Sequence, residues 1–207
     1  MKRVINLDNW NRKEHFKFFS ALDDPFWGIT TTVDFTSIYQ QSKNMEVSFF
    51  LYSVHFLLKC INATTAFKLR IENGEVVEYD KINISPTIGR EDGTFGFGFF
   101  EYDTDLSLFI ENAEKEIHRV KNSTGLSFSK DTARADVIRY SALPWFAFSE
   151  MKHAGSIQTG DSIPKISTGK LIQEKKKLLL PISISVHHGL VDGRNVAEFI
   201  QNVKDGQ

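Results

Sequence analysis

The sequence predicts a mixed α/β fold in which helices and a mixed β-sheet form layers. Three observations predict it. Two segments alternate apolar and polar residues with a period of two, as half-buried strands do. Two others carry apolar residues at helical spacing, and one Asn-Gly pair between apolar runs is typical of a β-hairpin. Since no repeat, low-complexity tract or linker divides the chain, we expect one domain over residues 1–207.

The N-terminal half is expected to contain two helices, a strand and a hairpin. The first helix covers residues 9–21, with Asp8 or Asn9 as its cap. Residues 28–36 alternate in period two, are rich in β-branched side chains and form a strand. A strongly buried helix follows, because five apolar residues fall at helical spacing: Phe50, Val54, Leu57, Leu58 and Ile61. Asn73-Gly74 then joins two strands, since both residues tolerate the positive φ of a type I′ turn.

The C-terminal half is expected to add two helices and two strands. An amphipathic helix covers residues 106–120 and is capped near Thr104 or Asp105. Residues 137–142 form a strand, and residues 178–186 form the clearest strand of the chain, because aliphatic side chains there alternate with proline and serine. A last helix begins near Asn195.

Composition excludes several classes of protein. The 25 basic and 26 acidic side chains give a net charge of −1, which argues against a nucleic-acid-binding surface. A single cysteine, Cys60, rules out an intrachain disulfide and fits a reducing compartment. Polar residues interrupt every apolar run before it reaches the length of a signal peptide or a membrane span. We therefore expect a cytoplasmic protein with no membrane partner, whose 18 phenylalanines fill a core or line an apolar pocket.

The segment that carries chemistry is His187-His188, followed by Asp192, directly after the clearest strand. Adjacent strand residues point to opposite faces, so only one of the two imidazoles faces any given cleft. A neutral imidazole with a pKa near ~6.5 can remove a proton from a hydroxyl or thiol, and Asp192 can help to orient the site. A metal-ligand run and a purely structural histidine remain alternatives, although adjacent strand residues make poor joint ligands.

Several separated segments resemble one known family. They are the His-His-x-x-x-Asp-Gly motif and residues 8–16, 61–67, 73–75, 141–145 and 180–196. In the same order, these segments resemble the chloramphenicol acetyltransferase family, which is related to the dihydrolipoamide acyltransferase catalytic domain. The resemblance covers nearly the whole chain. It implies the CoA-dependent acyltransferase fold, a two-layer α/β sandwich with a mixed sheet and helices packed on one face.

The resemblance also implies a mechanism and its residues. His188 is the general base that takes the proton of an acceptor hydroxyl, which attacks the thioester of acetyl-CoA directly. Ser141 donates a hydrogen bond to the tetrahedral oxyanion. Asp192 forms an ion pair with Arg12 and keeps the loop in shape. Acetyl-CoA is a co-substrate, no acyl-enzyme forms and no metal is required.

Further residues are implied as contacts of the cofactor and the acceptor. Trp145, Trp10 and Lys170 lie near CoA, with Lys170 on its 3′-phosphate, and Ser167 retains a hydroxyl near the oxyanion. Aromatic side chains that could contact the acceptor are Phe19, Trp27, Phe95, Phe97 and Phe128. The family is a homotrimer with each active site between subunits, and the acceptor is a small molecule, with chloramphenicol as the leading candidate.

Two departures from the family keep alternatives open. Ser48 stands where the family has a lysine that contacts CoA. Residues 151–163 are far more polar than the apolar pocket residues that the family places there. The alternatives are a related O- or N-acyltransferase for a more polar acceptor, a non-catalytic CoA-binding trimer, or a metal-dependent hydrolase.

Overall fold

A computed structural model describes residues 1–155 and 160–206 and shows a main sheet of mixed direction. Its strands are, in spatial order, β2 (Phe26–Asp34), β10 (Lys177–His187), β8 (Lys165–Thr168), β7 (Val137–Ala142), β5 (Asn83–Gly89) and β6 (Phe95–Phe97), with β9 (Ile172–Glu174) paired to the start of β10. The pairs β5–β7 and β7–β8 are parallel, whereas β2–β10, β10–β8 and β5–β6 are antiparallel. The predicted mixed sheet is confirmed.

A second, three-stranded sheet contains the predicted hairpin. Its strands are, in order, β1 (Lys2–Val4), β4 (Glu75–Tyr79) and β3 (Leu69–Glu72). Asn73 and Gly74 have φ values of 51° and 81°, as a type I′ turn requires at both central positions. The turn predicted from the Asn-Gly pair is therefore confirmed.

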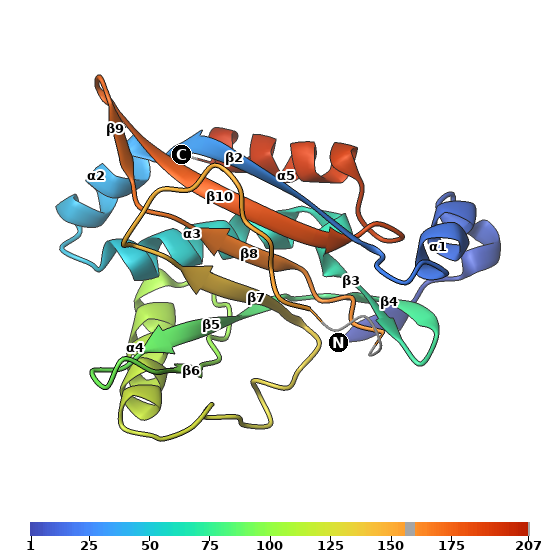
Figure 1. The fold of residues 1–207 in the computed structure, drawn as a ribbon, viewed down its shortest axis with the longest axis horizontal. Coiled ribbons are helices and arrows are strands. Elements are labelled where there is room, and N and C mark those ends of the chain that lie inside the picture. The colour runs from blue at the N-terminus through green and yellow to red at the C-terminus, as the bar shows by residue number, and fades with distance from the viewer. Residues whose placement is uncertain (156–159, 207) are drawn as a thin grey trace.

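Helices form the second layer, apart from α1 (Lys13–Ser20), which lies beyond one end of the main sheet in Figure 1. The others are α2 (Thr36–Asn44), α3 (Phe49–Ala63), α4 (Leu106–Lys121) and α5 (Gly193–Asp205), and two short 3₁₀ turns are η1 (Leu7–Asn9) and η2 (Thr65–Lys68). Figure 1 shows α3 and α5 behind the main sheet, and residues that follow β7 crossing its front face. The expected two-layer arrangement, with helices packed on one face, is confirmed. No helix among the described residues is long and apolar enough to cross a membrane.

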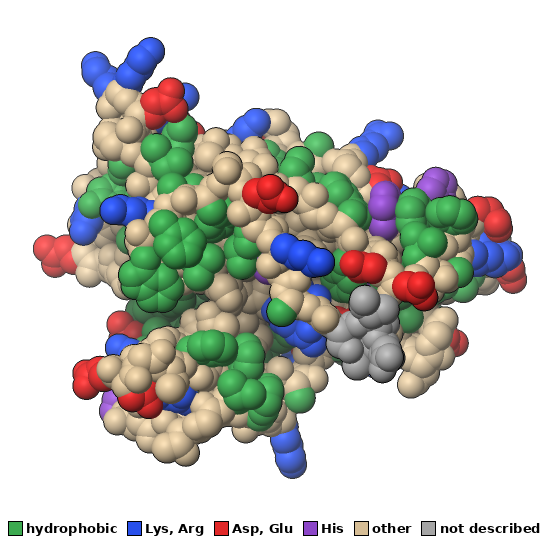
Figure 2. Space-filling model, in the orientation of Figure 1, with side chains coloured by type: hydrophobic (Ala, Val, Ile, Leu, Met, Phe, Trp, Pro, Cys, Tyr) green, Lys and Arg blue, Asp and Glu red, His purple; other side chains and the backbone are tan. Residues whose placement is uncertain are grey.

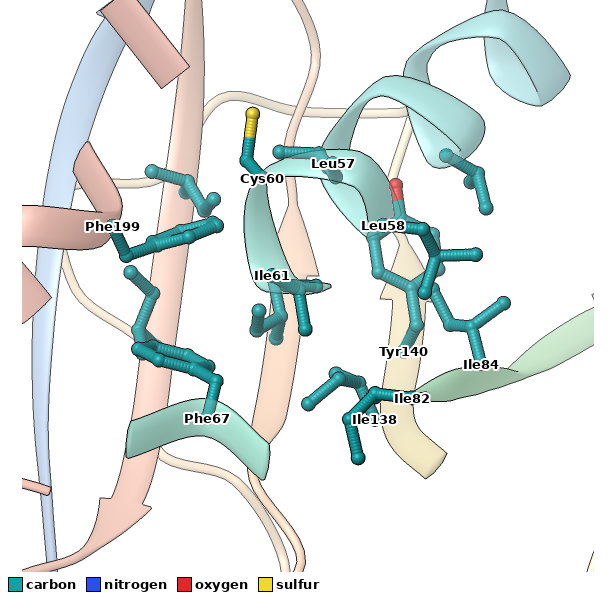
Figure 3. Close-up of a cluster of buried hydrophobic side chains, with 14 of the residues drawn as sticks. Leu57, Leu58, Cys60, Ile61, Phe67, Ile82, Ile84, Ile138, Tyr140 and Phe199 are labelled. Carbon is teal, nitrogen blue, oxygen red and sulfur yellow. The ribbon is translucent and has the colours of Figure 1, made fainter. Parts of the chain in front are cut away.

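The core lies between α3 and the helix-facing side of the sheet. Leu57, Leu58 and Ile61 of α3 are almost fully buried. Figure 3 shows them between two groups of side chains, with Phe67 and Phe199 on one side and the sheet residues on the other. The rings of Phe67 and Phe199 lie 4.9 Å apart. The helical spacing of apolar residues in the sequence therefore located the centre of the core.

The register of the sheet separates an apolar face from a hydroxyl-rich face. Ile166 pairs with Ile184, and both are buried against the helices. Because side chains alternate along a strand, their neighbours point to the other face. There Ser141 pairs with Ser167, and Ser167 pairs with Ser183. This face therefore carries a row of hydroxyl groups across three adjacent strands.

Some element boundaries differ from the prediction. The first helix begins at Lys13 rather than Asn9, because residues 7–9 form a separate 3₁₀ turn capped by the Asn6 side chain. The strand predicted for residues 28–36 covers Phe26–Asp34, and Thr36 already belongs to α2. A hydrogen bond from the Thr36 amide to Asp34 Oδ1 marks this change of direction.

Candidate active site

His188 lies in the turn that follows β10 and is held by aromatic rings. Its backbone amide donates to Pro25 O at 2.8 Å. Its imidazole stacks on Phe19, with 3.8 Å between ring centroids and 13° between planes, and Trp27 lies 5.4 Å away. Trp27 is itself fixed by a 2.9 Å hydrogen bond from its indole Nε1 to Val191 O. Nδ1 of His188 is buried without a partner among the described residues, which leaves Nε2 as the nitrogen that can meet a hydroxyl.

His187 points to the other face and is a structural residue. It is 3% exposed, and its Nδ1 accepts a hydrogen bond from the Gly189 amide at 3.2 Å. Burial lowers the pKa of His187 to about 4, so the ring is neutral at neutral pH. A Cβ on Gly189 would lie 3.0 Å from Cε1 of His187, so a larger residue there would require the buried ring to shift. With Ser185, His187 lines a cavity of about 680 Å³, here called the His187 cavity.

Arg12 and Asp192 connect α1 to α5 and to the turn that holds His188. Their side chains form an ion pair, and Nη2 of Arg12 also donates to His188 O at 3.3 Å. Asp192 is the N-cap of α5 and accepts from the amides of Arg194 and Asn195. Partial burial alone would raise the pKa of Asp192, but the hydrogen bonds from Arg12 and from the Asn195 amide outweigh it and hold that pKa below its usual value.

Removing Asp192 should therefore destabilise the fold. Asp192→Ala loses the helix cap and leaves the half-buried Arg12 without its carboxylate, an expected cost of about 2–4 kcal/mol. Asp192→Asn keeps a capping side chain and should cost less. Asp105→Ala is the matched control, because it removes only the exposed cap of α4 and should cost about 1 kcal/mol. Urea unfolding at one protein concentration measures all three, and equal losses for Asp192→Ala and Asp105→Ala would contradict the role of Arg12.

The same ion pair has a predictable pH dependence. The pKa of Asp192 in the folded protein lies below its unfolded value of about 3.9. The stability that Asp192 adds is therefore present above that pH and is lost as the pH falls through the folded-state pKa. In both Asp192 variants, the loss of stability at acid pH should be less steep than in the wild type.

A second group of predicted residues surrounds another cavity, of about 630 Å³. This Ser141 cavity has Thr87, Phe97, Phe128, Ser141, His153 and Ser167 in its wall. Oγ1 of Thr87 donates to Oγ of Ser141 at 3.1 Å, so the Ser141 hydroxyl hydrogen is free to donate into the cavity. Phe97 and Phe128 stack with centroids 5.4 Å apart. The cavity therefore offers a free O–H donor beside an aromatic wall, in a volume typical of small-molecule sites.

Within one chain, His188 and Ser141 lie at opposite ends of the sheet. Ser141 is level with Ser183, two strands away. His188 lies five residues beyond Ser183, which is about 17 Å along the strand, and the two strands add about 10 Å across it. Phe19 and Trp27 lie with His188, whereas Phe97 and Phe128 lie with Ser141. The predicted site residues thus form two separate groups in one chain, called half-sites below.

The residues expected near CoA are also divided between the two ends. Trp145 is 74% exposed, and the amide of exposed Lys170 donates to Phe146 O at 2.9 Å, so Trp145 and Lys170 share the end of β7 and β8. Trp10 packs on Phe16 of α1, at the His188 end. Ser48 is exposed at the start of α3. No group of three or more metal-ligating side chains occurs within residues 1–155 and 160–206.

Sequence reasoning assigned no role to several residues of the Ser141 cavity, among them Thr87, His153 and Lys165. Thr87 orients Ser141, and Nε2 of His153 lies 3.0 Å from Oγ of Ser167. Lys165 also reaches the wall, although a lysine in a polar stretch gives no signal of burial. Met151, His153 and Ala154 of the polar segment 151–163 line this cavity. Residues 156–159 of that segment lie outside the described residues.

Comparisons with known proteins identify the family. The family profile described as Chloramphenicol acetyltransferase matches residues 2–204. Chloramphenicol acetyltransferase 3 of Escherichia coli is 27% identical over 202 residues, which cover 97% of this chain and 94% of that protein. A chloramphenicol acetyltransferase of Clostridioides difficile is 28% identical over 205 residues, with coverages of 97% and 93%.

Solved structures give the same result. A chloramphenicol acetyltransferase superposes with a TM-score of 0.91 at 30% identity, and the match covers 99% of each chain. A dihydrolipoamide acetyltransferase of Azotobacter vinelandii has a TM-score of 0.69 at 14% identity, with coverages of 93% and 84%, and shares the fold. The chain belongs to the chloramphenicol acetyltransferase family of acyltransferase enzymes.

Proposed function

We propose that this enzyme transfers the acetyl group of acetyl-CoA to a hydroxyl group of a small-molecule acceptor, with chloramphenicol as the first acceptor to test. Nε2 of His188 takes the hydroxyl proton while the oxygen attacks the thioester carbonyl. The tetrahedral oxyanion accepts a hydrogen bond from Ser141. The C–S bond then breaks, and the CoA thiolate takes the proton back from His188. The whole chain acts as one catalytic domain over residues 1–207.

The separation of His188 from Ser141 is the observation that carries this proposal. A base about 17 Å along the strand from the oxyanion donor cannot serve the same reaction in one chain. Two copies can serve it if the His188 end of one faces the Ser141 cavity of the next. A homotrimer with three such contacts uses every half-site.

The surface supports an assembly of this kind. Large apolar side chains are exposed at both half-sites, among them Phe18 at one and Phe128 and Trp145 at the other. Figure 2 shows separate hydrophobic patches on the face that the helices leave open. Exposed apolar groups of this size mark contact surfaces or ligand sites. Trp145 and Lys170 would bind CoA from the chain that supplies Ser141, and Trp10 would approach it from the chain that supplies His188.

Mixing two inactive variants tests this arrangement. His188→Ala and Ser141→Ala chains each lack one half-site, but an interface between them combines an intact His188 with an intact Ser141. Mixed trimers, formed by co-expression and purified through two different tags, should regain about one third of wild-type activity, because a trimer that contains both variants has an intact His188 facing an intact Ser141 at one of its three interfaces. The measurement is CoA release detected with a thiol reagent.

The control is a mixture of the same purified variants without subunit exchange, which should stay inactive. If mixed oligomers are also inactive, both residues must act from the same chain, and the proposed site is wrong. Analytical ultracentrifugation of the wild type gives the number of chains in each particle.

A second candidate function has one specific observation in its favour. The wall of the Ser141 cavity includes Arg139, His153 and Lys165 besides its aromatic rings. These side chains favour a more polar acceptor than chloramphenicol. His188 and Ser141 would act in its acetylation as they do in the first proposal.

A further inference from the structure

Two hydroxyl groups lie side by side in the wall of the Ser141 cavity. Ser141 of β7 is level with Ser167 of β8 in a parallel pair, and neighbouring strands lie about 4.8 Å apart. Both side chains line the cavity. The rest of Ser167 is buried, so bulk water competes little for its hydroxyl. A negatively charged oxygen held beside Ser141 is therefore also within reach of Ser167.

His153 holds the Ser167 hydroxyl in place. Its Nε2 lies 3.0 Å from Oγ of Ser167, and its Nδ1 is buried with no partner among the described residues. Burial, and then the charge of Lys165, lower the pKa of His153, so the ring is neutral at neutral pH and carries one hydrogen. Nε2 is the nitrogen that has a partner, and a hydrogen on Nε2 is donated to Ser167. The ring thus acts on the cavity through the Ser167 hydroxyl.

The Ser141 hydroxyl is supported in the same manner. Oγ1 of Thr87 donates to Oγ of Ser141 at 3.1 Å. A hydroxyl oxygen that accepts one hydrogen bond keeps its own hydrogen for another. With Nε2 of His153 as its donor, Ser167 is in this state too. The cavity then has two adjacent O–H donors, each oriented by a side chain behind it.

We propose that His153 is a positioning residue for acetyl transfer. It donates from Nε2 to Ser167, whose own hydrogen then points at the same oxyanion as that of Ser141. Two oriented donors stabilise the charge of the tetrahedral intermediate more than that of the thioester carbonyl, so they act on kcat. This inference rests on the proposed acetyl transfer and adds His153 to the residues that support it.

A double-mutant cycle tests the connection between the ring and the hydroxyl. Ser167→Ala should lower kcat by about 10–100-fold, as the loss of a hydrogen bond to a charged group does. His153→Met should lower it by about 3–10-fold, because the hydroxyl remains but loses its neutral supporting hydrogen bond. In the Ser167→Ala protein, His153→Met should have no further effect on kcat. Steady-state CoA release measures all four proteins, and KM for acetyl-CoA should change little.

A rescue variant and a matched control separate positioning from stability. His153→Gln keeps an N–H donor on a side chain of similar reach and should recover most of kcat. His55→Met is the control, because His55 of α3 is also half-buried and its Nε2 also has one partner, Asp103 O at 2.9 Å. Its ring packs on Phe109 in the helical layer. His55→Met should lower Tm as His153→Met does and leave kcat unchanged.

The outcomes distinguish this inference from the proposed function. An equal effect of His153→Met with and without Ser167 overturns the inference and leaves acetyl transfer standing. A rise in KM for the acceptor at unchanged kcat assigns the ring to acceptor binding and also overturns it. Equal losses of kcat in His153→Met and His55→Met would mean that the ring only supports the fold.

Nitrogen-15 NMR of protein labelled at histidine covers the case in which the wild type releases no CoA, which is the failure of the proposed function alone. The His153 signals are assigned by their absence from the spectrum of His153→Gln. A hydrogen on Nε2, with a signal that shifts in Ser167→Ala, supports the inference. A hydrogen on Nδ1, or a signal that Ser167→Ala leaves unchanged, overturns it.

Discussion

Replacing His188 by alanine is expected to lower kcat for CoA release by about 10²–10⁴-fold, the usual contribution of a positioned general base. The ring stacks on Phe19 and its Nδ1 has no partner among the described residues, so its removal breaks no side-chain hydrogen bond described there. The backbone amide still donates to Pro25 O. The fold should therefore survive, and CoA release with acetyl-CoA and chloramphenicol measures the loss.

The control for this variant is His118→Ala. His118 is exposed on α4, away from both half-sites, so its removal should change neither kcat nor the circular dichroism spectrum. Turnover by His188→Ala at the rate of the His118 variant would remove the base assignment. A loss of helical signal in His188→Ala alone would instead show that the ring is needed for folding.

Replacing Ser141 by alanine should lower kcat by about 10²–10³-fold, as the loss of one oxyanion donor does. The Ser141 hydroxyl accepts from Thr87, and this hydrogen bond directs its own hydrogen into the cavity. The oxygen of the ground-state thioester attracts that hydrogen less than the oxyanion does, so KM for acetyl-CoA should change much less than kcat. Steady-state kinetics with both substrates varied separate the two constants.

Ser183→Ala is the matched control for this second substitution. Ser183 belongs to the same row of hydroxyls on the sheet, but its Oγ is 3.5 Å from Met151 O and it does not line the Ser141 cavity. Its kcat should stay within a few-fold of the wild type. An equal loss in both serine variants would mean that the row supports the sheet rather than the reaction.

The sequence predicted those elements whose pattern is long enough to repeat. The apolar side chains of β10 alternate from Leu180 to Val186, and α4 repeats its apolar spacing along its sixteen residues, so both were located to within one or two residues. By contrast, α2 remained unassigned, because its nine residues bury only Ile38 and Ser42. Its helical state depends on packing against α3 and β10, which a local pattern does not show.

Short strands explain most of what was missed in the candidate site. β8 has four residues and β6 has three, too few for a period of two to be recognised. Yet β8 supplies Lys165, which was not assigned, beside Ser167, which only the family resemblance indicated. These strands form because neighbouring strands provide their hydrogen-bond partners, and that information lies far away in the chain.

The distance between the two groups of site residues was not visible in side-chain patterns, although the family resemblance implied a site between subunits. Motif order indicated His188, Ser141, Arg12 and Asp192, and the structure shows the Arg12–Asp192 ion pair. How far Ser141 lies from His188 depends on β10 running antiparallel to β8, which side-chain patterns do not reveal. Contacts such as that of Thr87 with Ser141 depend in turn on the register between β5 and β7.

The position of β10 has a consequence for local stability. This strand is paired along one edge with β2 from Leu179 to His187 and along the other with β8 and β9, so its amides should exchange with deuterium most slowly. Helix α1 buries only Phe16 and should open at a much lower free energy. His188 is thus attached to a slowly exchanging strand, while Phe19, which stacks on its ring, belongs to a segment that can detach without global unfolding.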